Sequence, residues 1–178
     1  MGAHTTTSKM ITKAQYKHQY YQDLLSWSEL ENVSKTHVLT KLIPHGADGS
    51  TCYFMGMASM TRKLNALAQD LEKEYNMNVD AHVYMCLDKD KPHPFGVHFD
   101  FADNIIVQCE GVTNFKVWDK AEETEKNYQM DIKTEPILDK VLRPGDAISI
   151  PRFYPHLATT LQDPRLSVSF PLTNLKTK

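Results

Sequence analysis

A change in sequence periodicity near residue 79 most constrains the fold of this chain. From that point apolar and polar residues alternate in short runs, separated by loops with Pro, Gly, Asp or Lys, and this pattern predicts strands. The runs are VDAHVYMCL, HFDFADNIIVQC, NFKVW, ISI and RLSVSF. Because these strands follow helices instead of alternating with them, we expect a mainly β fold with flanking helices, built as a jelly-roll barrel.

The N-terminal part of the sequence predicts two helices and two short strands. Residues 13–30 and 59–75 contain no Gly or Pro and carry apolar residues three or four positions apart, the second after a candidate N-cap at Ser59. The apolar positions are Tyr16, Tyr20, Leu24 and Trp27 in the first helix, and Leu64, Leu67, Leu71 and Tyr75 in the second. Residues 38–43 and 51–55 are typical of strands.

No linker or repeat divides the sequence, so we expect a single domain over residues 10–178. Within it, a helical buttress at about 13–75 precedes a barrel at about 79–171, and residues 1–9 form a disordered lead-in. The 20 basic and 22 acidic side chains give a net charge of −2, which does not indicate a nucleic-acid or membrane partner. Without a signal peptide or a membrane-spanning apolar run, we expect a soluble, cytoplasmic protein.

The sequence His98-Phe99-Asp100 is the first candidate for a metal site. Side chains two positions apart on a strand lie on the same face, so His98 and Asp100 can converge on one point. An imidazole and a carboxylate suit a divalent first-row metal. Phe99 and Phe101 would then pack on the other face.

Residues 142–156, LRPGDAISIPRFYPH, supply a second candidate. Gly145 and Asp146 predict a tight turn into the strand AISI, Pro151 ends that strand, and His156 opens the next one. Such a segment presents His156 at the mouth of a barrel. Two histidines and one carboxylate occupy one face of an octahedral metal and leave three positions open, as in non-haem Fe(II) oxygenases. A closed structural zinc site would need four protein ligands.

These segments together resemble the cupin-like JmjC oxygenases, in particular the branch that hydroxylates ribosomal proteins and transfer RNA. The shared pattern is a strand with a tyrosine (AHVYM), the H-x-D triplet (HFD), an apolar strand (NIIVQ), the Gln108-Cys109-Glu110-Gly111 motif, an aromatic strand (NFKVW), and the 142–156 segment. The resemblance covers about residues 79–171. It implies a double-stranded β-helix of the cupin type, with Fe(II) held by His98, Asp100 and His156. It also implies 2-oxoglutarate as cosubstrate, dioxygen, and hydroxylation of a prime substrate.

The resemblance also identifies candidate contacts to 2-oxoglutarate. Tyr84 could donate its hydroxyl to a carboxylate, and Asn104 matches an active-site asparagine of related asparaginyl hydroxylases, with Gln108 a weaker candidate of the same parity. The family has a Lys or Arg two residues after the motif glycine that binds the distal carboxylate, whereas this chain has Thr113 there. Lys116 lies on the opposite face.

Arg165 is our candidate for the relocated anchor. In Arg165-Leu166-Ser167-Val168-Ser169-Phe170, alternation places the arginine and the two serines on one face and the apolar residues on the other. An Arg-x-Ser nine residues after His156 resembles the cosubstrate clamp of the prolyl-hydroxylase and nucleic-acid-demethylase branches. We therefore expect Arg165 and Ser167 to bind 2-oxoglutarate.

The remaining titratable residues have simpler interpretations. We expect Asp103 and residues 88–90 to be solvated loop charges, and His82 to share the inward strand face of Tyr84. The other histidines are expected to be surface residues, and the cysteines to be unpaired apolar side chains. They are His4, His18, His37, His45 and His93, and Cys52, Cys86 and Cys109.

Two other functions remain open from the sequence. One is a metal-binding cupin dioxygenase or isomerase that does not use 2-oxoglutarate, and the other is a non-catalytic cupin scaffold. The prime substrate stays undefined as a protein side chain, RNA or a small molecule. Ribosomal-protein hydroxylases usually carry dimerisation and winged-helix segments after the barrel, which this sequence does not show, so their substrate is not carried over. A homodimer also remains open.

Overall fold

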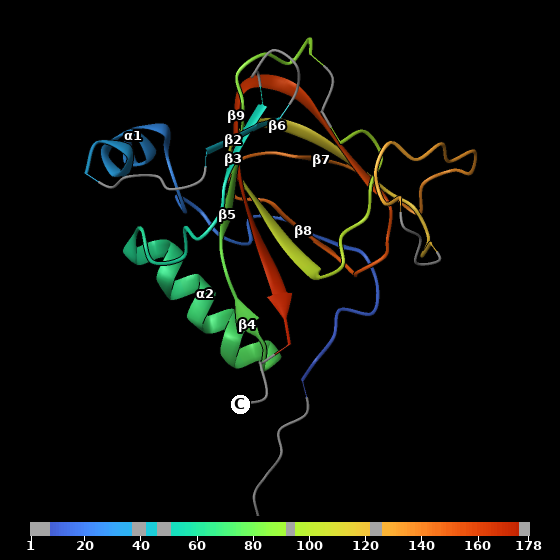
Figure 1. Ribbon diagram of the computed structural model, residues 1–178, viewed down its shortest axis with the longest axis horizontal. Coiled ribbons are helices and arrows are strands. Elements are labelled where there is room, and N and C mark those ends of the chain that lie inside the picture. The colour runs from blue at the N-terminus through green and yellow to red at the C-terminus, as the bar shows by residue number, and fades with distance from the viewer. Residues whose placement is uncertain (1–7, 37–41, 46–50, 92–94, 122–125, 175–178) are drawn as a thin grey trace, which may run out of the picture.

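The computed structural model describes residues 8–36, 42–45, 51–91, 95–121 and 126–174. Its two helices are α1 (Trp27–Thr36) and α2 (Arg62–Tyr75). Its strands are β1 (Gln15–Lys17), β2 (Leu42–His45), β3 (Thr51–Phe54), β4 (Asn78–Val79), β5 (His82–Cys86), β6 (Asp103–Val117), β7 (Leu138–Leu142), β8 (Ala147–Ile150) and β9 (His156–Thr173). The predicted mainly β fold with flanking helices is confirmed (Figure 1).

The strands form one antiparallel sheet in the order β1-β8-β6-β9-β5-β3-β2, with β4 beside β9 and β7 beside β6. Its centre is the pair β6 and β9, which are the two longest strands. The first half of β6 also pairs with β8, and its second half pairs with β7. Both long strands therefore pass from one wall of the barrel into the other.

Gly111 bends β6 between these two halves. The β6–β9 register shifts between Gln108 and Thr113, and Gly111 has a φ of +72°. A Cβ there would lie 2.5 and 2.6 Å from the carbonyl oxygens of Gln162 and Pro164. Only glycine satisfies both the positive φ and the close backbone approach. The glycine of the Gln-x-x-Gly motif therefore has a structural role: it lets β6 bend and approach the backbone of β9 closely.

The predicted helix over residues 13–30 is wrong. Residues Gln15–Lys17 form β1, which pairs with β8, and α1 begins only at Trp27. The start of α1 is a capping box, in which the Ser26 hydroxyl accepts from the Glu29 amide and the Glu29 carboxylate accepts from the Ser26 amide. Apolar residues about four positions apart are compatible with a helix and also with a strand followed by turns. Here residues 15–17 form a strand because they pair with the edge of β8.

The predicted helix over residues 59–75 is confirmed with a later start. Thr61, not Ser59, is the N-cap, and its hydroxyl accepts from the Leu64 amide at 3.1 Å. The apolar stripe of α2 packs into the larger of two core clusters, together with buried apolar residues of β5, β6 and β9. Figure 1 shows α1 and α2 on the same side of the sheet.

The N-terminal region is more than a helical buttress, because β2 and β3 extend the sheet beyond β5 and β1 extends it beyond β8. The runs that predicted separate strands at residues 98–109 and 114–118 belong mostly to the single strand β6. Of the predicted lead-in, residues 1–7 lie outside the described part. The Lys9 amide donates to the carbonyl of Tyr75 at 2.8 Å.

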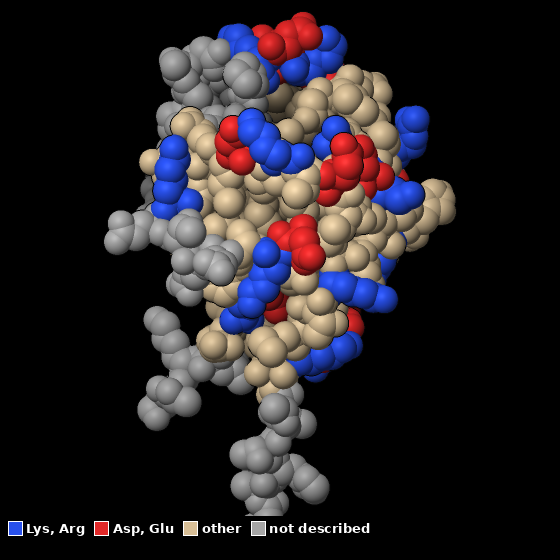
Figure 2. Space-filling view, turned by 90° about the vertical axis from the view of Figure 1, so that its right-hand side faces the viewer, with Lys and Arg blue, Asp and Glu red and all other residues tan. Residues whose placement is uncertain are grey.

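The surface carries both signs of charge. Figure 2 shows basic and acidic side chains interspersed over the face that it presents, consistent with the net charge of −2. Neither described helix is long and apolar enough to cross a membrane. None of the three cysteines forms a disulfide within the described part of the chain, and Cys86 is buried.

Candidate metal centre

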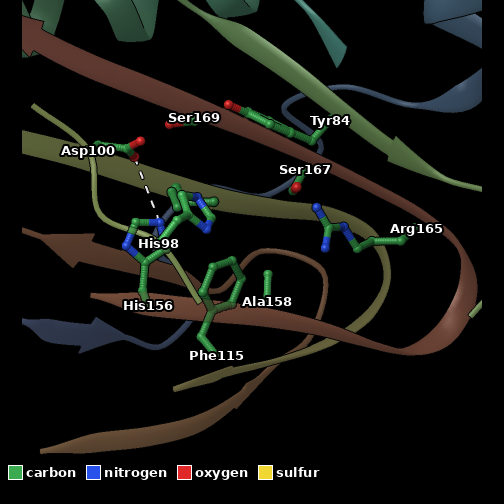
Figure 3. Close-up of a pocket in the computed structure, with 10 residues that line it drawn as sticks. Tyr84, His98, Asp100, Phe115, His156, Ala158, Arg165, Ser167 and Ser169 are labelled. Carbon is green, nitrogen blue, oxygen red and sulfur yellow. Dashed lines mark ion pairs between the residues drawn. The ribbon is translucent and has the colours of Figure 1, made fainter. Parts of the chain in front are cut away.

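The structure brings His98, Asp100 and His156 together, as predicted. One potential ligand atom from each lies within 4.8 Å of the others, and no fourth His, Cys, Asp or Glu of the described residues joins the group. The His156 Nε2 is 3.7 Å from an oxygen of Asp100 (Figure 3). The strand expected for His98-Phe99-Asp100 is reduced to one bridge, in which His98 and His156 exchange backbone hydrogen bonds of 3.1 and 2.7 Å.

Backbone carbonyls orient both imidazole rings. The Nδ1 of His98 lies 3.1 Å from the carbonyl of Gly96, and the Nδ1 of His156 lies 3.0 Å from that of Tyr154. A carbonyl only accepts hydrogen bonds, so each Nδ1 carries a proton, and Nε2 is the ring nitrogen left for a metal. Burial and the neighbouring His156 lower the pKa of His98 to about 4, which keeps its ring neutral.

A small pocket, part of it open to solvent, extends from the three ligands into the barrel. Its lining is apolar on one side and polar on the other (Figure 3). The lining residues are Tyr84, His98, Asp100, Ile106, Phe115, His156, Ala158, Arg165, Ser167 and Ser169. We call this space the inner chamber.

Arg165 lies at the far end of the inner chamber from the metal ligands. Its side chain is 2% exposed, and its Nε and Nη1 are buried with no hydrogen-bond partner among the described residues. Burial lowers the pKa of Arg165 from its ordinary value, but a guanidinium stays protonated in proteins. An unpaired buried cation is costly, and its presence here indicates a site for an anion.

Tyr84 forms the wall between the inner chamber and the surface. Its ring stacks on that of Tyr53 at 5.4 Å, and β5 pairs it with Ser167 on β9. Burial, with the charge of Asp100 as a second cause, raises the pKa of Tyr84, so its hydroxyl stays protonated and can donate a hydrogen bond.

A second space, which we call the outer chamber, opens on the other side of Tyr84. It includes an open groove between Met55, Phe101 and Pro171, which also reaches Asp100, Asn104 and Ser169. His82 shares the inward face with Tyr84, as predicted, and its Nε2 lies 3.4 Å from Asp80 in this chamber. Asp100 and Tyr84 border both chambers, so a metal bound at Asp100 would face both.

The predicted cosubstrate contacts divide into two sets. Arg165, Ser167 and Tyr84 line the inner chamber. Thr113 is buried on β6 but is not among the lining residues, and its hydroxyl has no partner among the described residues. Asn104 lies in the outer chamber, with its amide directed to Asp100.

Three other expectations need correction or qualification. Asp103 is not a solvated loop charge, because it is 1% exposed and accepts from the Arg152 side chain at 3.1 Å. Phe101 contacts Phe99 edge-on, with ring centroids 5.6 Å apart, but it is 54% exposed and is not part of the interior. His18 bonds Asp146, as expected of a surface histidine, whereas His4, His37, His93 and the His45 side chain lie outside the described part.

Sequence reasoning did not assign roles to Ser169, Phe115 or Asp80. Ser169 shares the strand face of Arg165 and Ser167, and this alternation could have indicated its place in the site. Phe115 and Asp80 are brought to the chambers by the curvature of β6 and by the turn before β5, which no local pattern predicts.

The comparisons with known proteins agree with this geometry. The family model described as JmjC domain matches residues 57–178. The bifunctional lysine-specific demethylase and histidyl-hydroxylase NO66 of Drosophila persimilis is 26% identical over 123 residues, covering 67% of this chain and 18% of that protein. Ribosomal oxygenase 1 of Danio rerio is 30% identical over 100 residues, covering 52% of this chain and 18% of that protein.

Solved structures show the same fold. The ribosomal oxygenase YcfD of Escherichia coli, solved in complex with cobalt and 2-oxoglutarate, aligns with a TM-score of 0.69 at 19% identity, over 93% of this chain and 49% of that one. The chain therefore spans about half of this structure and about a fifth of the two sequence relatives above.

Proposed function

Because the chain belongs to the JmjC domain family, we propose that it is an Fe(II)- and 2-oxoglutarate-dependent oxygenase that hydroxylates a prime substrate. The observation that carries the proposal is the pairing of an open metal site with a buried, unpartnered arginine across one chamber. The names of its relatives, a histidyl-hydroxylase and a ribosomal oxygenase, support the same reaction class.

The residues present fit the metal. His98, Asp100 and His156 offer two imidazoles and a carboxylate, the ligand set of non-haem iron oxygenases, and leave half of the coordination sphere open. When bound, Fe(II) with 2-oxoglutarate and dioxygen supplies the oxidising power that inserts one oxygen atom into a C–H bond. The protein holds these ligands in place, positions the two substrates and excludes water.

The residues of the inner chamber fit 2-oxoglutarate, a five-carbon dicarboxylate. Arg165 binds the distal carboxylate through its buried guanidinium, which matches a carboxylate in a paired geometry that lysine does not offer. Ser167 and the Tyr84 hydroxyl add neutral donors along the chamber. Phe115, Ile106 and Ala158 cover the opposite side and keep bulk water away.

The outer chamber receives the prime substrate. Its groove reaches Asp100 from the surface without passing through the inner chamber, so both substrates can be bound at the same time. The face in Figure 2 shows no surface of uniform charge. The proposed binding partners are 2-oxoglutarate, dioxygen and a prime substrate.

The test is the release of succinate from 2-oxoglutarate by the Fe(II)-loaded protein without a prime substrate. We expect slow turnover that requires both Fe(II) and dioxygen, and that is lost in His156→Ala. A protein that binds Fe(II) but releases no succinate would instead be a cupin that does not use 2-oxoglutarate. A protein that does neither would be a scaffold.

A further inference from the structure

The three metal ligands differ in how firmly the surrounding chain holds them. The two imidazole rings are oriented by carbonyls of their own neighbouring backbone, and the side chain of His156 is 4% exposed. The Asp100 side chain is 43% exposed and lies in the segment that precedes β6. A carboxylate in this position can rotate, so its orientation depends on a side-chain partner.

Asn104 is that partner. It is buried at the start of β6, and its Nδ2 donates to Asp100 Oδ2 at 2.7 Å and to the carbonyl of Ala102 at 3.3 Å. The Asp100 carboxylate and the Ala102 carbonyl only accept hydrogen bonds, so the NH₂ side of the amide must face them. The amide carbonyl is thereby directed to the other side, toward β9.

Ser169 fixes this orientation from β9. Its hydroxyl is buried and donates to Asn104 Oδ1 at 2.9 Å. Ser169 also borders both chambers, and β9 pairs it with His82 of the outer chamber. A continuous chain of hydrogen bonds therefore runs from Ser169, through Asn104, to Asp100.

We propose that Asn104 and Ser169 are positioning residues that hold the Asp100 carboxylate for the metal, with Ser169 acting only through Asn104. The inference rests on the proposed function for the presence of a metal at His98, Asp100 and His156. This positioning role differs from the direct cosubstrate contact expected from the sequence, because both polar atoms of the Asn104 amide form hydrogen bonds within the protein.

The probe is Co(II), and the measurements are its dissociation constant and the visible absorption of the bound ion, which reports the coordination geometry. Removing an outer partner of a metal ligand typically weakens metal affinity by about 10- to 100-fold, and we expect this for Asn104→Ala together with a changed spectrum. A neutral hydrogen bond contributes about 1 kcal/mol, so we expect Ser169→Ala to weaken Co(II) by about fivefold.

The double variant separates positioning from a general structural effect. If Ser169 acts through Asn104, adding Ser169→Ala to Asn104→Ala should not weaken Co(II) further. The matched control is Asn114→Ala, since Asn114 also lies on β6 and also donates to an aspartate, Asp139, at 2.7 Å, but outside both chambers. This variant should bind Co(II) as the wild type does.

Each outcome is decisive. Asn104→Ala with the wild-type affinity and spectrum overturns the proposal, as does a full fivefold loss from Ser169→Ala in the double variant. If the Asn104→Ala variant does not fold, unchanged Co(II) binding by the Ser169→Ala variant is by itself enough to overturn the positioning proposal. A wild-type protein that binds no Co(II) removes the metal site and the proposed function, whereas normal wild-type binding with unaffected variants removes only the positioning role.

Discussion

Replacing Arg165 with methionine should have opposite effects on stability and on cosubstrate binding. The substitution removes a charge that is 2% exposed and has two nitrogen atoms without partners among the described residues, while it keeps most of the side-chain volume. Without 2-oxoglutarate, the wild type carries the desolvation cost of this cation with no compensating anion. With 2-oxoglutarate bound, the guanidinium and the distal carboxylate form a buried pair.

The expected magnitudes follow from the burial of Arg165. Removing one partner of a buried ion pair costs about 3–5 kcal/mol, so Arg165→Met should weaken 2-oxoglutarate binding by at least about a hundredfold. Replacing a buried charged group with a well-packed apolar one stabilises proteins by about 1–4 kcal/mol, and we expect a gain in the free energy of unfolding in this range for the ligand-free variant.

Two measurements test these effects separately. Anaerobic calorimetric titration of the Mn(II)-loaded protein gives the dissociation constant of 2-oxoglutarate. Urea denaturation gives the free energy of unfolding with and without the cosubstrate. At a concentration of about 100 times the wild-type dissociation constant, 2-oxoglutarate should stabilise the wild type by about 2.7 kcal/mol, but a variant with hundredfold weaker binding by only about 0.4 kcal/mol.

The control is Arg62→Met, which removes an exposed arginine from the first turn of α2 and should change neither quantity. A change of less than about threefold in the dissociation constant of Arg165→Met would refute the reasoning. In that case the unpaired guanidinium does not bind the cosubstrate, and a cupin that does not use 2-oxoglutarate becomes the better interpretation.

Four further predictions follow from the fold and the site. His156→Ala should remain folded by circular dichroism and lose stoichiometric metal in elemental analysis, and metal retention would contradict the triad. A fragment of residues 79–178 should not fold, because the main core cluster joins α2 to the sheet; a folded, active fragment would disprove this. Gly111→Ala should destabilise the protein by about 1–3 kcal/mol in urea, because it forces an alanine to a φ of +72°; wild-type stability would contradict the strain argument. Burial alone would raise the pKa of Asp146, but hydrogen bonds from two backbone amides and a histidine lower it. The ionised Asp146 carboxylate therefore stabilises the fold at pH values above its ordinary pKa of about 3.9, and this stabilisation is lost as the pH falls through the lowered pKa. Asp146→Ala should therefore cost about 1–3 kcal/mol at pH 7 and less below about pH 4, and an equal cost at both would exclude this linkage.

The alternation of side chains on strands determined much of the candidate site. It predicted that His98 and Asp100 share a face, that Arg165 and Ser167 share another, and that His82 and Tyr84 point the same way. The structure shows the second and third arrangements, and it brings His98 and Asp100 together although only His98 forms a strand bridge. The period of two follows from the geometry of an extended backbone, so it can be read from neighbouring residues alone.

The tertiary structure decided what depends on residues far apart in the chain. Residues 15–17 became a strand because β8 offered them an unpaired edge, and Asp103 is buried because Arg152 compensates its charge. The Asn104 amide donates to Asp100 and accepts a hydrogen bond from the hydroxyl of Ser169, which lies 65 residues later in the chain.

The position of the cosubstrate anchor shows the same division. Residue type and alternation alone show that Thr113 carries no charge and that Arg165 lies on a polar strand face. Only the bend of β6 at Gly111, against the backbone of residues 162–165, places that face opposite the metal ligands across the inner chamber. Local patterns fix which side of a strand a residue occupies, whereas strand pairing over long distances in the sequence fixes what lies across from it.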